Sequence, residues 1–149
     1  MAKPELPVFT IGFTHKSAEQ FFERLQRAGV KRIIDVRLNN SSQLAGFSKK
    51  DDLAYFLHRI LGIEYIHEPL LAPTQPMLDA YRKAKVKWED YERSFLDLIE
   101  ERRIEEKIPR GVVAGGCLLC SEDRPHKCHR RVVVEYLERK WGKLNIEHL

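Results

Sequence analysis

Two thiols and two imidazoles lie close together in the sequence, at Cys120, His126, Cys128 and His129. The apolar run before them ends at Cys120, a short polar loop follows, and the next apolar pattern predicts a helix that runs to about Trp141. The first turn of a helix has free backbone N–H groups and the positive end of the helix dipole, so it binds anions and lowers the pKa of a nearby thiol. We therefore expect any chemistry of this protein at this strand-to-helix connection.

Nucleophilic catalysis by cysteine needs a thiolate near a helix N-terminus or a base, and both Cys120 and Cys128 meet this condition in the sequence. Glu122 and His129 are the candidates for the general acid or base. The phosphatase loop, in which an arginine stands six positions after the cysteine, is absent because a histidine occupies that position. In an alternative interpretation, Cys128 packs beneath the helix start while His129 and Arg130 bind an anion.

The same group of residues also allows a metal interpretation, because cysteine and histidine are the usual ligands of zinc. Four ligands could come from Cys120, His126, Cys128 and His129, although the adjacent Cys128 and His129 are hard to aim at one ion. The chain has no second ligand pair of the usual spacing, so we expect no metal and no other cofactor. A zinc-binding or thiol-sensing domain remains an alternative, with bound zinc or a Cys120–Cys128 disulfide as its signature. Cys117 faces the other side of the expected strand from Cys120 and is predicted to be a buried core residue.

The pattern along the chain alternates short β-like runs with amphipathic helices, which is typical of an α/β fold with a parallel sheet. Strands are expected at 8–11, 31–36, 64–67, 112–119 and 144–149. Helices are expected after caps at Ser17 and Ser48, over 77–85 and 88–106, and from the polar loop that follows Cys120 to about Trp141. We therefore predict a single three-layer domain over residues 1–149, with a mostly parallel central sheet of about five strands flanked by helices.

In a parallel sheet the loops that follow the strands meet at one edge, and ligands bind there. Polar residues of three such loops are therefore expected to form one pocket. The predicted ligand contacts come from Thr14, His15, Arg37, Asn39, Ser41 and Arg130. Arg37 shares a strand face with Asp35, so its guanidinium either binds an anion or closes an internal ion pair at the strand end.

The composition permits a partner that carries phosphate. The 149 residues have a net charge of +4, and basic side chains cluster in the segment 83–87 and along the last helix from Arg130 to Lys140. The expected partner is a phosphorylated small molecule or a nucleic acid. The chain shows no signal peptide and no apolar stretch long enough to span a bilayer, so we expect a cytoplasmic location and no membrane partner. Nothing in the sequence indicates the oligomeric state.

Several blocks of the sequence are similar to the signatures of one family. They are Thr10-Ile11-Gly12, Ile34-Asp35-Val36-Arg37, Gly62-Ile63-Glu64-Tyr65, the block from Leu118 to Arg130, and the closing His148-Leu149. On these residues the chain resembles the domain-of-unknown-function 488 family over nearly its whole length. Many members have a histidine directly after Thr-Ile-Gly, where this chain has Phe13, Thr14 and His15. The resemblance implies an α/β domain with a polar pocket, and it implies no established substrate, reaction or cofactor.

Taken with its basic charge, the expected pocket favours a domain that binds a small anion, such as a phosphate or nucleotide-like molecule, or acts on it as an enzyme. The alternatives are a nucleic-acid-binding module without catalysis and the zinc-binding or thiol-sensing domain. The sequence leaves open whether the protein turns over a substrate.

Overall fold

Five parallel strands form the central sheet of this protein, in the order β3-β2-β4-β1-β5. The computed structural model describes residues 6–39, 46–83, 86–122 and 125–149. The strands are β1 (Leu6–Gly12), β2 (Arg32–Asp35), β3 (Glu64–His67), β4 (Gly116–Cys120) and β5 (Leu144–His148). The predicted α/β fold with a parallel five-stranded sheet is therefore confirmed.

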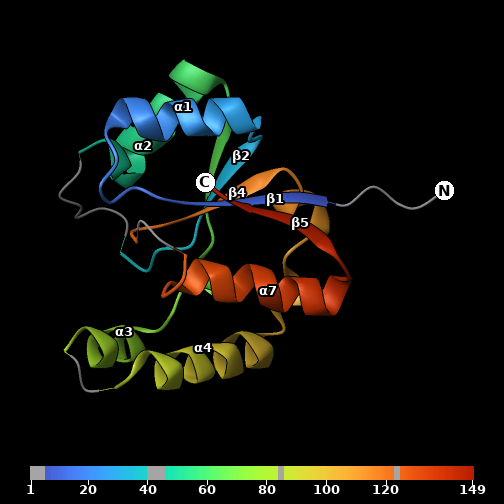
Figure 1. The fold of residues 1–149 in the computed structure, drawn as a ribbon. Helices are drawn as coiled ribbons and strands as arrows, with labels where there is room; N and C mark the ends of the chain where they lie inside the picture. The colour runs from blue at the N-terminus through green and yellow to red at the C-terminus, as the bar shows by residue number, and fades with distance from the viewer. Residues whose placement is uncertain (1–5, 40–45, 84–85, 123–124) are drawn as a thin grey trace.

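Helices cover both faces of this sheet (Figure 1). They are α1 (Ala18–Ala28), α2 (Lys50–Phe56), α3 (Gln75–Arg82), α4 (Trp88–Arg102), α5 (Ile104–Lys107), α6 (Arg110–Val113) and α7 (His129–Trp141), with a π-helical turn at Leu57–Leu61 and 3-10 turns at Gly46–Ser48 and Pro69–Leu71. Helices α1 and α2 lie on one face, α7 lies on the other, and α4 packs on the outer side of α7. Within the described residues, no helix has the length and apolar character needed to cross a membrane.

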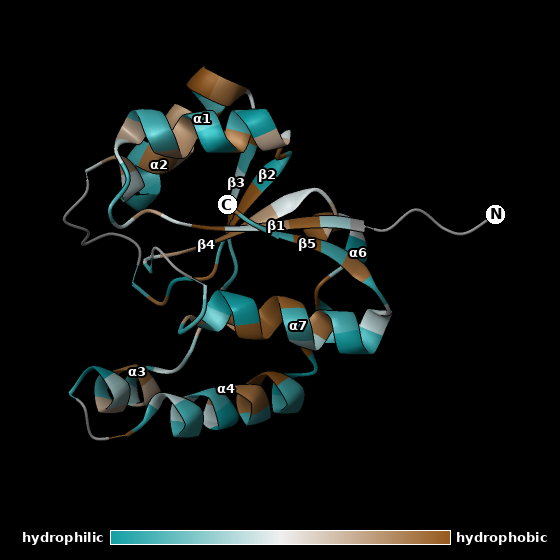
Figure 2. Cartoon of the chain, in the orientation of Figure 1, coloured by the Kyte–Doolittle hydropathy of each residue, from teal (hydrophilic) through white to brown (hydrophobic). Residues whose placement is uncertain are grey.

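Apolar side chains fill the space on both sides of the sheet. Figure 2 shows hydrophobic residues both in the strands and in the helices that cover them, among them α7. Along β4, Leu118 and Cys120 belong to the core beneath α4 and α7, whereas Cys117 and Leu119 belong to the core beneath α1 and α2. Successive side chains of a strand point to opposite faces, so Cys117 and Cys120 face apart as predicted. Cys117 is fully buried, which confirms it as a core residue.

One predicted strand segment is wrong. Helix α6 is a helical turn where the apolar pattern predicts the first half of the fourth strand, and β4 begins only at Gly116. The chain turns at Gly115, whose φ of 77° lies in the region that favours glycine. Arg32 Nη1 then donates to the carbonyl oxygens of Val112 and Ala114 at 2.9 and 2.7 Å. These hydrogen bonds satisfy carbonyl groups that a strand would have paired within the sheet.

The two predicted helix caps have different outcomes. At α1, Ser17 and Gln20 form the predicted capping box, in which each side chain accepts from the backbone N–H of the other, at 3.1 and 3.0 Å. At α2, the N-cap residue is Lys49 and no side chain caps the helix, so the predicted cap by Ser48 is wrong.

Candidate active site

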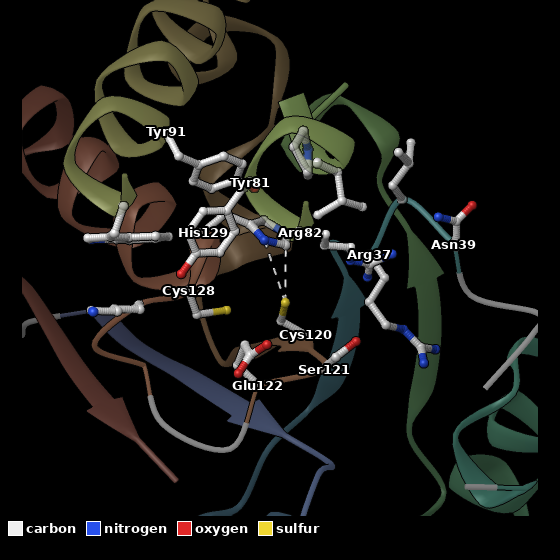
Figure 3. Close-up of a pocket in the computed structure, with 15 residues that line it drawn as sticks. Arg37, Asn39, Tyr81, Arg82, Tyr91, Cys120, Ser121, Glu122, Cys128 and His129 are labelled. Carbon is white, nitrogen blue, oxygen red and sulfur yellow. Dashed lines mark hydrogen bonds between the residues drawn. The ribbon is translucent and has the colours of Figure 1, made fainter. Parts of the chain in front are cut away.

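The candidate site lies at the carboxyl edge of the sheet, where β4 ends at Cys120 and α7 begins at His129. Cys128 is the N-cap residue of α7, and Figure 3 shows its side chain close to those of Cys120 and His129. One donor atom from each of these three residues lies within 4.8 Å of the other two, and all three residues are buried. The structure thus brings together both thiols and one of the two imidazoles, whereas His126 is exposed at the surface.

The imidazole of His129 is fixed in orientation. Its Nε2 lies 2.7 Å from the carbonyl oxygen of Val36, which can only accept, so Nε2 carries a proton. The edge of the ring packs against Phe95, with the centroids 5.4 Å apart. Its Nδ1 then lies 3.5 Å from Cys120 Sγ. His129 is therefore placed to exchange a proton with the thiol through Nδ1.

The surroundings of Cys120 favour its thiolate form. A hydrogen bond from the Cys128 thiol lowers the pKa of Cys120, and the charge of Arg130 and the backbone N–H groups of Glu122 and Ser121 lower it further, which outweighs the opposing effect of burial. Burial raises the pKa of Cys128 well above its ordinary value, and its hydrogen bond to Cys120 and the charge on Cys120 raise it further. Of the two thiols, Cys120 is therefore the one that loses its proton more readily.

Arg130 connects the loop after β4 to the end of β1. Its side chain is 1% exposed, and its Nη1 donates to the carbonyl oxygen of Glu122 and to Cys128 Sγ, the latter at 3.5 Å. A Cβ atom on Gly12 would lie 1.6 Å from the Glu122 carbonyl oxygen and 3.0 Å from Arg130 Nη1, so this close approach requires glycine. Because it is buried, Arg130 does not belong to the basic surface predicted along the last helix, and its charge lowers the pKa of Cys120.

Arg37 forms the internal ion pair that was one of its two predicted roles. Its Nε and Nη2 donate to the Asp35 carboxylate at 2.9 and 2.8 Å, and the Tyr65 hydroxyl donates to the same carboxylate. Asp35 is fully buried, Arg37 is 2% exposed, and the guanidinium lies over the Phe13 ring. Arg37 Nη1 is buried without a hydrogen-bond partner among the described residues, and anion binding by Arg37 stays a prediction.

The other predicted ligand-binding residues lie in different surroundings. Thr14 donates through Oγ1 and through its backbone N–H, at 3.2 Å, to the Ser121 carbonyl oxygen, so it fastens the loop after β1 to the loop after β4. His15 is exposed, has a φ of 62°, and does not line the cavity beside Cys120. Asn39 does line that cavity. Ser41 lies outside the described residues.

A cavity of about 90 Å³ opens beside Cys120 and Cys128 and has an aromatic wall. The wall consists of Tyr81, Trp88 and Tyr91, of which Tyr81 and Tyr91 stack with their ring centroids 4.9 Å apart. Burial raises the pKa of Tyr91, and the neighbouring Cys120 and Cys128 raise it further, so its hydroxyl stays protonated. The cavity therefore offers a sulfur whose pKa is lowered, flat apolar surfaces and a protonated hydroxyl within one small volume.

Three exposed charged residues, Arg82, Glu122 and Lys127, also line this cavity. Figure 3 shows Tyr81, Tyr91 and Arg82 on the side of the cavity opposite Ser121 and Glu122, with the Cys120 sulfur between them. Of these cavity residues, Glu122 is predicted from the sequence as a site residue, whereas Tyr81, Arg82 and Lys127 are not. No motif marks the first two, because only the packing of α3 against α4 brings the end of α3 to the site.

Cys120, Cys128 and His129 have the donor types that bind zinc, and their spacing allows all three to reach one ion. Zinc takes four ligands in structural sites, and among the described residues this group has three. An ion here would need a further ligand, such as water or a substrate. The zinc-binding alternative therefore stays a prediction, which metal analysis of the purified protein tests.

Comparison with known proteins gives one match. The family model described as domain of unknown function DUF488 matches residues 17–137. The matched region contains the whole cluster of Cys120, Cys128 and His129, together with the aromatic wall and Arg82. No curated protein and no solved structure matches the chain.

Proposed function

This chain belongs to the DUF488 family, and from the geometry of its site we propose that it is a cysteine-dependent enzyme acting on a small anionic molecule. The observation that carries the proposal is the Cys120–Cys128 pair, whose sulfurs line one cavity beside His129 and whose pKa values are shifted in opposite directions, that of Cys120 down and that of Cys128 up. A thiolate is the reactive form of cysteine, and a lowered pKa keeps that form populated near neutral pH.

In the proposed reaction, Cys120 Sγ attacks an electrophilic atom of the substrate. A bond forms from sulfur to that atom, while the bond to the leaving group breaks and its electron pair departs with the leaving group. A water molecule then attacks the adduct, and cleavage of the bond to sulfur returns the thiolate, so that the net reaction is hydrolysis. His129 Nδ1 and the Glu122 carboxylate are the groups placed to move the protons of these steps.

The charges around the cavity favour an anionic substrate. Arg82 and Lys127 both line it, whereas Glu122 is the one acidic residue among the described residues that line it. The charge of Arg37 is compensated by the buried Asp35 carboxylate. Arg82 lines the cavity, and no described acidic side chain forms an ion pair with it. The small volume and the stacked Tyr81 and Tyr91 rings suit a compact molecule with a flat group.

Alkylation with two reagents of similar size tests both parts of this proposal. Iodoacetamide is neutral and iodoacetate is anionic, so their relative rates at Cys120 report the preference for negative charge. We expect Arg82→Gln to lower the ratio of the iodoacetate rate to the iodoacetamide rate about fivefold, equivalent to about 1 kcal/mol. Peptide mass spectrometry with fragment-ion assignment follows the modification of each cysteine.

The control variant is Lys83→Gln, which removes the same charge from the neighbouring residue, and Lys83 does not line the cavity. We expect the Lys83 variant to keep the wild-type ratio. Equal ratios in wild type and Arg82→Gln would contradict the anionic substrate class. Slower iodoacetamide modification at Cys120 than at Cys128 would contradict Cys120 as the nucleophile.

A further inference from the structure

We infer that Cys120 and Cys128 are a modification site, at which a hydroperoxide converts the two thiols into a reversible disulfide that switches the nucleophile off. The inference rests on the proposed function, because it takes Cys120 as the reactive thiolate. It adds to that function a means of control and assigns Cys128 a chemical role of its own.

The first support is the position of the two sulfur atoms. They lie within 4.8 Å of each other, although Cys120 ends a strand and Cys128 caps the N-terminus of a helix. Both are free thiols, and Figure 3 shows their side chains next to each other at the cavity. A disulfide requires the two sulfurs to approach to about 2.05 Å, which side-chain rotation and a small shift of the connecting loop can supply.

The second support is that a small oxidant can reach both sulfur atoms through the cavity. Cys120 is 5% exposed and Cys128 is 2% exposed, yet both line the same cavity. A molecule as small as hydrogen peroxide fits a cavity of about 90 Å³, whereas the thiol of a second protein does not. Oxidation is therefore expected to join these two cysteines within the chain and not to link two chains.

The oxidation of the two thiols to a disulfide proceeds in two steps. In the first, the Cys120 thiolate attacks the terminal oxygen of the hydroperoxide, so that the S–O bond of a sulfenic acid forms, the O–O bond breaks and an alkoxide or hydroxide leaves. In the second, Cys128 sulfur attacks Cys120 sulfur, the S–O bond breaks, and the departing hydroxide takes the Cys128 proton to form water. The two sulfurs together lose two electrons to the peroxide, and an external dithiol returns them.

Cys117 is an internal reference for this chemistry. It lies on the same strand as Cys120 but faces the core beneath α1 and α2, where it is fully buried. Burial raises its pKa, and it does not line the cavity. The structure therefore predicts that peroxide leaves Cys117 unmodified while it oxidises the other two cysteines.

The test is peptide mass spectrometry of the wild-type protein, without reduction, after treatment with a small excess of hydrogen peroxide. We expect a Cys120–Cys128 disulfide, loss of iodoacetamide modification at Cys120, and recovery of both thiols with dithiothreitol. In Cys128→Ser, or in Cys128→Ala if serine destabilises the fold, we expect no disulfide and a sulfenic acid at Cys120 that dimedone traps. Cys117→Ser is the matched control and is expected to form the disulfide as the wild type does.

The outcomes separate this inference from the proposed function. If untreated Cys120 reacts rapidly with iodoacetamide but peroxide yields only sulfinic acid, the disulfide inference is overturned and the nucleophile stands. If Cys120 reacts slowly with both iodoacetamide and peroxide, the proposed function fails and the inference fails with it. A disulfide that includes Cys117 would also overturn the inference.

Discussion

Replacing Asp35 by alanine is expected to lower the free energy of unfolding by about 3–5 kcal/mol. Asp35 is fully buried at the end of β2, and its carboxylate accepts from the side chain of Arg37, from the Arg37 backbone N–H at 3.1 Å, and from the Tyr65 hydroxyl. Its removal leaves the buried Arg37 guanidinium with a charge that nothing compensates. Urea denaturation of the variant and the wild type measures the difference.

Two further variants separate the lost ion pair from a general effect of substitution. Glu64→Ala removes an exposed carboxylate from the adjacent strand β3, and it is expected to change the stability by no more than about 0.5 kcal/mol. Asp35→Ala combined with Arg37→Met removes both charges, and it is expected to recover part of the stability that Asp35→Ala loses. If Asp35→Ala lowers the free energy of unfolding by no more than Glu64→Ala does, the buried ion pair does not stabilise the fold.

Replacing Arg130 by methionine is expected to slow the alkylation of Cys120 at pH 7 severalfold. The positive charge of Arg130 lowers the pKa of Cys120, so its removal raises that pKa and reduces the thiolate fraction at neutral pH. Methionine keeps an apolar chain in the space that the arginine stem fills, and circular dichroism checks that the variant is folded.

Arg139→Met provides the control for this prediction, because Arg139 is exposed on the same helix. We expect this variant to alkylate at the wild-type rate. The Arg130 variant should approach the wild-type rate again at high pH, where both proteins hold Cys120 as a thiolate. An unchanged rate at pH 7 in Arg130→Met would show that the Arg130 charge does not act on the thiol.

The convergence of the site could be predicted from the sequence because it follows from topology. A parallel sheet brings the ends of its strands to one edge, and the strand-to-helix connection at Cys120 to His129 was visible as a change of pattern. The alternation of side chains along β4 also predicted correctly that Cys117 and Cys120 face apart. These features depend on the local residue pattern and on the order of the strands and helices, and both can be read from a single sequence.

The parts that the sequence did not predict depend on packing between distant elements. Arg82 and Tyr81 reach the site because α3 packs on α4, and nothing in the spacing of their residues indicates that contact. The aromatic spacing of α4 correctly predicted a buried face, yet Trp88 and Tyr91 also line the cavity. The two possible roles of Arg37 could not be separated either, because the burial of Asp35 and the hydrogen bond from Tyr65 become visible only in the folded chain.

The pH dependence of Cys120 alkylation by iodoacetamide tests the central claim most directly. A free thiol of ordinary pKa, about 9.0, reacts faster as the pH rises through that value. Because the Cys120 pKa is lowered, its rate is expected to rise and to level off at a lower pH than the rate of an ordinary thiol. A rate that is still rising steeply at pH 9 would show that Cys120 is an ordinary thiol, and it would contradict the account of the site as a thiolate held ready for reaction.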